Sequence, residues 1–215
     1  MTDYFPPLEP GTCYHIYNRG NNRENIFIKP GNYPYFLKKY ALYLSRVLDT
    51  YVYNLLPNHF HLVVRIKPKA EIVPALTGMP GVIDFPSLQD LESLSEGDIV
   101  SELFRRFFIA YAKAINKQED RVGSLFQKNF KRRPVQSDGH FTNLIYYVHT
   151  NAQLHGICDD FRDWPYGSYH SILSDGATRL QRTEVLGWFD TKESFEQYHL
   201  HYVDLKNIEQ LMIED

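Results

Sequence analysis

The segment from Tyr51 to Lys67 constrains the fold most, because apolar and polar side chains alternate along it. One face holds Phe60, Leu62, Val64 and Ile66, and the other holds His59, His61, Val63, Arg65 and Lys67. This period of two predicts a half-buried strand. A second strand is predicted over 50–56, and the short Pro57-Asn58 connection between the two predicts a tight hairpin.

His59 and His61 lie two residues apart on that strand, which places their α-carbons about 6.6 Å apart with both imidazoles pointing the same way. Two imidazoles held like this can bind one divalent cation. Arg65 and Lys67 continue the same face, where a phosphate could lie. The alternative is a strand whose polar face carries two histidines without a metal, and the spacing alone does not decide between the two.

A second histidine pair, His199 and His201, has the same spacing but lies in a segment, 194–203, where aromatic residues recur at helical intervals. On a helix, residues two apart point about 200° apart, so this pair cannot bind one ion. We expect both histidines on a solvated helix surface.

The other predicted elements complete an α+β fold. They are a strand at Cys13–Arg19, a helix over 33–46, a long helix from an Asp98 cap, a strand over 124–135 and a helix at Asp138–Leu154. Strand, helix, hairpin, helix and strand in this order predict a ferredoxin-like or RRM-like antiparallel sheet with helices packed on one face. The acidic segment 68–98 is predicted to be an insertion with short helical turns. The C-terminal tail is predicted to form irregular aromatic turns and an acidic helix.

Composition limits the class of protein. A chain of 215 residues, 43% hydrophobic, is long enough for one substantial core with appendages and short for two independent domains. Cys13 and Cys158 lie outside any Cys-x-x-Cys pattern, which argues against a disulfide framework or a structural zinc site and favours reduced thiols. The chain has neither the start of a signal peptide nor an apolar run of membrane-spanning length. We therefore expect a cytoplasmic protein with no membrane partner.

Charge is segregated along the chain although the net charge is only -3. Residues 71–98 hold six acids and no Lys or Arg, whereas residues 99–136 hold nine basic residues against three acids. The basic part ends in the cluster Lys128, Lys131, Arg132 and Arg133. This segregation is typical of a phosphate-binding face. A solvated basic helix and loop would produce the same pattern, and the two interpretations carry similar weight.

Tyr147 and Asn151 lie one turn apart on the predicted helix Asp138–Leu154, about 40° from each other around its axis. They flank an apolar stripe made of Phe141, Leu144, Ile145, Val148 and Ala152. A tyrosine and an amide stacked beside a buried edge could face the strand that carries His59 and His61. Packing of Tyr147 at the core boundary is the alternative, and periodicity alone favours it.

Five stretches, spread over residues 14–169, match one family. They are Tyr14-His-Ile-Tyr-Asn-Arg-Gly20, Val52-Tyr-Asn-Leu-Leu-Pro-Asn-His-Phe-His-Leu-Val-Val64, Gly123-Ser-Leu-Phe-Gln-Lys-Asn-Phe-Lys131, Tyr147-Val-His-Thr-Asn151 and Trp164-Pro-Tyr-Gly-Ser-Tyr169. Together they resemble the HUH single-tyrosine transposases, whose name denotes histidine, hydrophobic residue, histidine. The resemblance is closest to the REP-associated tyrosine transposases. Ala152 stands where the family usually has proline, and the insertion 68–98 is long for the family.

The resemblance implies that Tyr147 is the nucleophile and that His59, His61 and Asn151 bind a divalent metal ion, Mg²⁺ or Mn²⁺, although zinc would also suit the imidazoles. It implies a single-strand DNA endonuclease and strand transferase that forms a covalent phosphotyrosine bond on single-stranded or hairpin DNA. The residues expected to hold the DNA are Arg19, Arg65, Lys67, Lys128, Lys131, Arg132 and Arg133.

The resemblance also predicts a transposase-like domain at residues 1–170, with a helical extension at 171–215, and leaves open whether the protein acts alone or as a homodimer. When bound to DNA, such a protein would associate with the nucleoid. A different class of function is a non-catalytic nucleic-acid-binding module with an RRM-like sheet. A hydrolase using metal-bound water is a third interpretation, but no third histidine or His-Glu-x-x-His spacing supports it.

Overall fold

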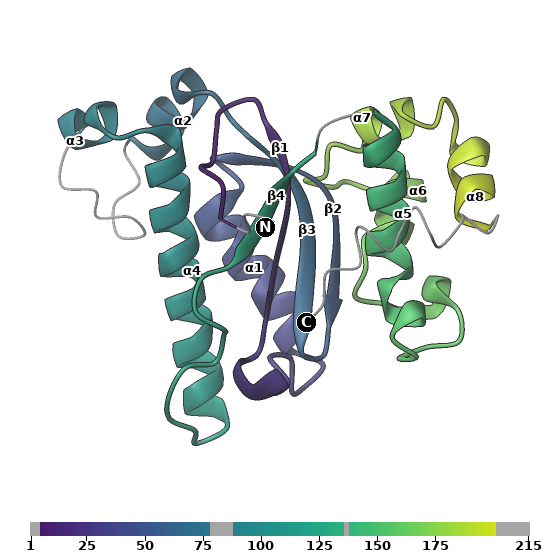
Figure 1. Ribbon diagram of the computed structural model, residues 1–215, viewed down its shortest axis with the longest axis horizontal. Helices are drawn as coiled ribbons and strands as arrows, with labels where there is room; N and C mark the ends of the chain where they lie inside the picture. The colour runs from purple at the N-terminus through teal and green to yellow at the C-terminus, as the bar shows by residue number, and fades with distance from the viewer. Residues whose placement is uncertain (1–4, 78–87, 136–137, 201–215) are drawn as a thin grey trace.

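The alternating segments fold as strands of one antiparallel sheet in the computed structural model, which describes residues 5–77, 88–135 and 138–200 (Figure 1). The strands are β1 (Cys13–Arg19), β2 (Leu48–Leu56), β3 (His59–Ile66) and β4 (Lys131–Pro134). Their spatial order is β2-β3-β1-β4, so β1 lies between β3 and the edge strand β4. The predicted hairpin is confirmed as β2 and β3.

Two helices, α1 (Asn32–Leu44) and α4 (Glu96–Gln118), cover one face of this sheet (Figure 1). Each buries the apolar stripe that its sequence predicts, including Phe36 and Tyr40 on α1 and Phe104 and Phe107 on α4. Four strands and two helices in the order β1, α1, β2, β3, α4, β4 confirm the predicted ferredoxin-like α+β arrangement.

A third long helix, α5 (Asp138–Leu154), lies on the opposite face of the sheet, the face that carries His59 and His61 (Figure 1). The physical reason is that the second face of the sheet is also apolar near its centre. Tyr51, Val52 and Val63 lie there, and they form one cluster with the buried stripe of α5. An amphipathic helix gains most by covering such a surface.

The predicted insertion and extension both contain helices in the described ranges. The insertion contains α2 (Lys69–Leu76) and α3 (Leu88–Ser93), and residues 78–87 between them lie outside the described ranges. The later part of the chain adds α6 (Tyr169–Leu173), α7 (Arg182–Gly187) and α8 (Lys192–Leu200), preceded by a single 3-10 turn, η2 (Phe161–Asp163). Another 3-10 turn, η1 (Asn21–Arg23), follows β1. The acidic end of the predicted tail, residues 201–215, is outside the described residues, and α6 spans the domain boundary predicted at residue 170.

Two predicted boundaries move for local reasons. The strand predicted over 124–135 is reduced to β4, because Asn129 adopts a φ of 64°, which interrupts an extended backbone. The long helix α4 begins at Glu96 instead of after Asp98, because the Ser95 hydroxyl accepts a hydrogen bond from the Asp98 backbone N–H and caps the helix.

Two expectations from composition concern the state of the cysteines and the presence of a membrane-spanning helix. Cys13 and Cys158 are both free thiols. Among the helices in the described ranges, none combines the length and the apolar character needed to cross a membrane.

The faces of β3 are arranged as the alternation predicts. Phe60 and its apolar neighbours at every second position lie in the cluster under α1 and α4 and are fully buried. The expectation of a half-buried strand is wrong, because α5 covers the other face as well. His59 and His61 are 5% and 1% exposed and therefore lie in a closed interior.

Replacement of Phe60 by Ala should lower the free energy of unfolding by about 3–5 kcal/mol, because it leaves a cavity among tightly packed rings. The Phe60 ring contacts Phe36 and Phe126 at centroid distances of 5.2 and 6.4 Å. Urea denaturation measures the change. Val122→Ala is the matched control, since Val122 is 93% exposed and its truncation should change stability by no more than about 0.5 kcal/mol. Equal effects of the two variants would contradict the assignment of the strand faces.

His199 is 3% exposed, so the expectation that it would lie on a solvated surface is wrong, whereas His201 is outside the described residues. The His199 Nδ1–H donates to the Phe195 carbonyl, which makes Nε2 the acceptor for the His149 Nδ1–H at 2.9 Å. The Ser168 hydroxyl then donates to the His149 Nε2 atom, also at 2.9 Å. Both imidazoles are neutral in this chain of hydrogen bonds, which ties α8 to α5.

Acidification should destabilise the protein through this pair. Burial lowers the pKa of His199 from 6.5 to about 4, and burial also lowers the pKa of His149. The unfolded chain therefore binds protons that the folded chain does not, and stability falls as the pH drops below about 6.5. From His199 alone, the free energy of unfolding should fall by about 2 kcal/mol between pH 7 and pH 5.

Urea denaturation at the two pH values tests this prediction. The variant His199→Phe should be less stable than the wild type at pH 7, because His149 loses its acceptor, but should lose less stability on acidification. His155→Gln, which alters an exposed histidine outside this chain of hydrogen bonds, should keep the wild-type pH dependence. A His199→Phe profile parallel to the wild type would contradict the assignment.

Candidate functional site

Two distant segments meet between β3 and α5, and they bring the four predicted site residues together. His59 and His61 begin β3, and Tyr147 and Asn151 lie one turn apart on α5. The His59 Nε2 atom lies 3.0 Å from the Asn151 Oδ1 atom. The ring centroid of His61 lies 5.0 Å from that of His59 and 5.5 Å from that of Tyr147. None of the four is more than 5% exposed, so the candidate site is enclosed.

Asn54 on β2 sets the position of α5 above the strands. Its side-chain Nδ2 donates to the backbone carbonyls of Val148 and His149, at 2.7 and 3.3 Å, in the middle of the helix. In the sheet register, Asn54 is the partner of His61. The helix is therefore held at the level of His61, which places Tyr147 beside it. Asn54 is fully buried, so these hydrogen bonds form away from water.

Both site histidines are held at their Nδ1 atoms. The His59 Nδ1 lies 2.6 Å from the Asn58 Oδ1, and the His61 Nδ1 lies 2.9 Å from the His15 Nε2. Histidines that bind metal ions through Nε2 are usually oriented by a hydrogen bond at the other ring nitrogen. The paired arrangement has the form expected of two metal ligands.

The contacts of His59 and Asn151 bear on whether a cation fits here. Both ring nitrogens of His59 face amide oxygens, of Asn58 and Asn151, but a neutral imidazole can donate from only one nitrogen. A cation between Nε2 and the Asn151 oxygen, or a turned Asn151 amide, satisfies the second contact. The buried Asn151 Nδ2 has no hydrogen-bond partner in the described part of the chain. The donor set of two imidazoles and one amide oxygen therefore fits a divalent cation.

No group of three His, Cys, Asp or Glu side chains within the described ranges is arranged to hold a metal ion. A cation at this site would therefore depend on the Asn151 amide. This requirement distinguishes the site from closed zinc sites, in which histidine and cysteine side chains provide the ligands.

The neighbouring strand β1 adds His15 and Tyr17, which were not among the predicted site residues, and brings the predicted Arg19 to the same face. Tyr17 is paired with His61 and Arg19 with His59, so alternate side chains of β1 share the face of the site. The rings of His15 and Tyr17 stack at a centroid distance of 4.9 Å. The signal was present in the sequence, because His15, Tyr17 and Arg19 follow the same period of two.

One further histidine lies at the border of the site. His155 follows Asn151 by one turn of α5, and its ring centroid lies 5.2 Å from that of His59. Unlike the four central residues, His155 is exposed. The helical spacing from Asn151 could have identified it.

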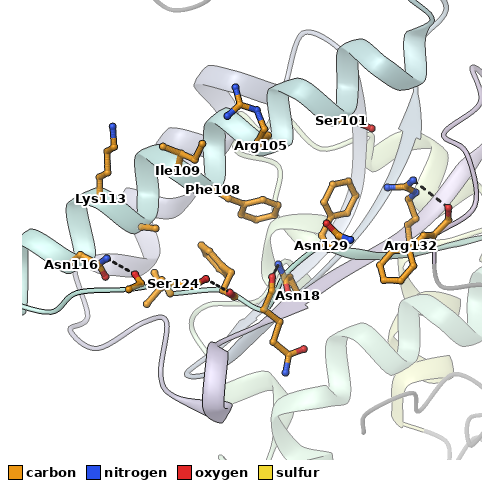
Figure 2. A pocket seen from close by; sticks show the side chains of 17 residues that line it. Asn18, Ser101, Arg105, Phe108, Ile109, Lys113, Asn116, Ser124, Asn129 and Arg132 are labelled. Carbon is orange, nitrogen blue, oxygen red and sulfur yellow. Dashed lines mark hydrogen bonds between the residues drawn. The ribbon is translucent and has the colours of Figure 1, made fainter.

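The predicted DNA-binding cations around β4 lie on two faces of the sheet. Lys131 is paired with Tyr17, and its Nζ lies 5.8 Å from the centre of the Tyr17 ring, on the side of the candidate site. Arg133 is paired with His15 on the same side. Arg132 points to the other face, where it lines a groove beside α4 (Figure 2), and Lys128 is exposed in the preceding loop.

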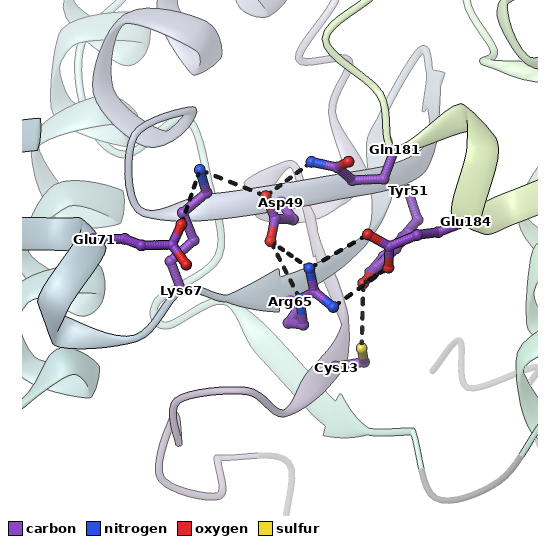
Figure 3. Close-up of polar contacts among 8 residues, drawn as sticks. All are labelled: Cys13, Asp49, Tyr51, Arg65, Lys67, Glu71, Gln181 and Glu184. Atoms are coloured by element: carbon purple, nitrogen blue, oxygen red, sulfur yellow. Dashed lines mark hydrogen bonds and ion pairs between the residues drawn. The ribbon is translucent and has the colours of Figure 1, made fainter.

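Arg65, in contrast, is separated from the site and belongs to a polar network that joins the sheet to α7 (Figure 3). Its guanidinium lies 2.9 Å from the Asp49 carboxylate and 3.3 Å from the Glu184 carboxylate. The Tyr51 hydroxyl also donates to Glu184, and burial raises the pKa of this phenol and of the nearby Cys13 thiol. Both groups therefore stay protonated and are poor nucleophiles.

Lys67 belongs to the same network. Its ammonium lies 3.5 Å from the Asp49 carboxylate and 3.8 Å from the Glu71 carboxylate (Figure 3). The Gln181 side chain donates to Asp49 as well. The structure thus gives Arg65 and Lys67 acidic partners and does not bring them to Tyr147.

Comparisons with known proteins point to the same kind of protein as the sequence motifs. No protein-family model matches the chain. A protein of Haemophilus influenzae, provisionally described as a REP-associated tyrosine transposase, is 31% identical over 55 residues, which are 26% of this chain and 31% of the relative. The chain thus aligns with less than a third of the length of this curated relative.

A solved structure of a REP-associated tyrosine transposase bound to a REP hairpin superposes on the chain with a TM-score of 0.54. The match covers 83% of this chain and 88% of that structure at 16% sequence identity. At this level of identity the match concerns the fold. The expected resemblance is therefore found in both comparisons, and the chain has a fold similar to that of a REP-associated tyrosine transposase.

Proposed function

We propose that the protein cleaves and rejoins single-stranded DNA through a covalent bond between DNA and Tyr147. The observation that carries this proposal is the position of Tyr147 beside His61. Asn151, one turn further along α5, lies within hydrogen-bond distance of His59. The similarity to a REP-associated tyrosine transposase and to the fold of one bound to a REP hairpin supports a transposase-like role in DNA processing. Single-stranded or hairpin DNA is the proposed substrate.

The chemistry is an in-line displacement at phosphorus. The Tyr147 phenol oxygen forms a bond to the scissile phosphate, the bond from phosphorus to one strand end breaks, and the leaving oxygen takes up a proton while the phenol loses one. A free phenol has a pKa near 10, so it needs help to act as a nucleophile at neutral pH. The new phosphodiester retains the energy of the old one, and a strand hydroxyl can reverse the attack and rejoin DNA.

His59, His61 and Asn151 are the residues that would hold a divalent cation, and Mg²⁺ or Mn²⁺ suits their mixed nitrogen and oxygen atoms. When bound, such a cation would polarise the scissile phosphate and neutralise the charge that develops on it. The role of the protein around it is orientation. Asn58 and His15 hold the two imidazoles at Nδ1, and the burial of the four central residues excludes water.

The DNA backbone would follow the cations near this site. Arg19, Lys131 and Arg133 lie on the face of the sheet that carries the histidines, and Lys128 and Arg132 continue around β4. Arg65 and Lys67 remain proposed contacts, but a phosphate there would compete with the carboxylates of Asp49 and Glu184.

The sheet itself argues against the second interpretation, a non-catalytic RRM-like binding module. Such modules stack unpaired bases on aromatic residues of an open sheet face. Here α1 and α4 cover one face and α5 covers the other, so the sheet offers no comparable platform over its central strands. A binding module without catalytic activity would also not need the contact between the two candidate cation ligands His59 and Asn151.

Replacement of Tyr147 by Phe should abolish DNA cleavage and the covalent adduct while DNA binding changes by no more than a few-fold. The change removes only the attacking hydroxyl. The measurement is a denaturing gel after incubation with single-stranded hairpin DNA and Mn²⁺. Tyr146→Phe is the matched control and should retain the adduct. Formation of the adduct by Tyr147→Phe would transfer the assignment to Tyr146 or another residue.

Binding of Mn²⁺, measured by electron paramagnetic resonance, should be lost in His59→Ala and in His61→Ala, because each removes a ligand. His15→Phe should weaken binding by about 10–100-fold, because it leaves both ligands in place and removes only the group that orients His61. His170→Gln, which alters an exposed histidine that is not among the proposed ligands, should bind as the wild type does. Thermal melts establish that each variant is folded. Unchanged Mn²⁺ affinity in the two ligand variants would refute the proposed cation site.

Replacement of Lys128, Lys131, Arg132 and Arg133 together by Ala should weaken binding of every DNA sequence alike. Phosphate contacts position the strand without reading it, so sequence preference should survive. The log–log dependence of affinity on salt should flatten by roughly 0.7 for each phosphate of a single strand that the variant no longer neutralises. Fluorescence anisotropy at several salt concentrations measures both. An unchanged slope would show that the cluster is only a solvated surface.

A further inference from the structure

A groove of about 690 Å³ lies between α4 and the segment 123–132, and we call it the α4 groove (Figure 2). It is on the face of the sheet opposite the candidate site, since Asn18 of β1 lines it whereas Tyr17 and Arg19 face the histidines. The groove is neither part of the His59 site nor needed for the chemistry at Tyr147.

The floor of the α4 groove is aromatic. Phe108 from α4 and Phe126 and Phe130 from the facing segment line it, and the Phe108 and Phe126 rings lie 4.9 Å apart. Ile109 on its wall is 40% exposed and adds an accessible apolar side chain to the groove. An occupant with flat apolar faces would be complementary to these residues.

The rim of the α4 groove is positive. Arg105 and Lys113 lie on the α4 side and Arg132 on the opposite side, and none of the described residues that line the groove is acidic (Figure 2). Glu102, just outside, binds both Arg105 and Arg106, so this trio retains one net positive charge. Cations above an aromatic floor are the combination that binds unpaired nucleic-acid strands, with phosphates on the cations and bases on the rings.

We infer that the α4 groove binds an unpaired stretch of the nucleic acid strand whose cleavage we assign to Tyr147. The inference rests on the proposed function. The volume of the groove is within the range of pockets that enclose a whole small ligand, which corresponds to roughly one or two nucleotides.

The edge strand β4 connects the α4 groove to the candidate site. Its side chains alternate, so Arg132 points to the groove while Lys131 and Arg133 point to the face that carries the histidines. No further strand pairs beyond β4 in the described sheet, so a nucleic acid strand can pass around this edge. Three consecutive cations on an edge strand thus provide a positive path from one face of the sheet to the other.

The test measures DNA binding to the full chain by fluorescence anisotropy, with a hairpin that carries a short single-stranded flank and the same hairpin with a blunt end. Ile109→Glu and Lys113→Glu should each weaken binding of the flanked hairpin by about tenfold, comparable to the loss of one stacked base. Binding of the blunt hairpin should be unchanged. Lys117→Glu is the matched control on the same helix, because Lys117 is exposed and does not line the groove. Circular dichroism establishes that all three variants are folded.

The outcomes separate this inference from the proposed function. If the wild type forms the Tyr147 adduct and the two groove variants bind the flanked hairpin as Lys117→Glu does, the groove assignment is wrong and the proposed function stands. If the wild type neither binds nor cleaves DNA, both are wrong. Displacement of the flanked hairpin by poly-glutamate, sensitive to Ile109→Glu, would identify an acidic peptide as the occupant and overturn the assignment.

Discussion

The hydrogen bonds from the Asn54 side chain to the Val148 and His149 carbonyls determine where the two halves of the site meet. A helix that packs through an apolar stripe alone can slide or rotate by a fraction of a turn at little cost, because hydrophobic contacts are not directional. A buried amide that is bonded to two carbonyls is directional, and leaving it without these partners would cost about 1–3 kcal/mol. Asn54 therefore gives the packing of α5 a defined register, and the contact between His59 and Asn151 depends on it.

The enclosed position of the site follows from a sheet that is apolar on both faces. The face under α1 and α4 forms the main core, and α5 covers the other face together with the helices that follow it. Polar groups in such an interior must find partners, and the described contacts of His59 and His61 show how they do: Asn58, Asn151 and His15 surround them. The same enclosure strengthens electrostatic interactions at the site, since little water is present to screen them.

Local periodicity predicted much of this structure, because the alternation on β3 and the stripes on α4 and α5 are imposed by the geometry of a strand and a helix. It did not predict which side of the sheet α5 would cover, since an amphipathic stripe fits either face. The expectation that His199 would be solvated failed for a similar reason: its partners, His149 and Ser168, lie far away in the sequence. Arg65 meets Asp49 and Glu184 in the same way, and no pattern within β3 reveals those carboxylates.

The two halves of the candidate site are separated along the chain, and Asn151 follows its neighbour His59 by 92 residues. A ribosome releases the histidine strand long before the tyrosine helix, and the six elements of the ferredoxin-like unit precede α5 in order of synthesis. That unit contains its own core, so it can begin to fold while α5 is still being made. The nascent protein would therefore acquire a stable sheet first and the ability to attack DNA last, when α5 docks on the finished strands.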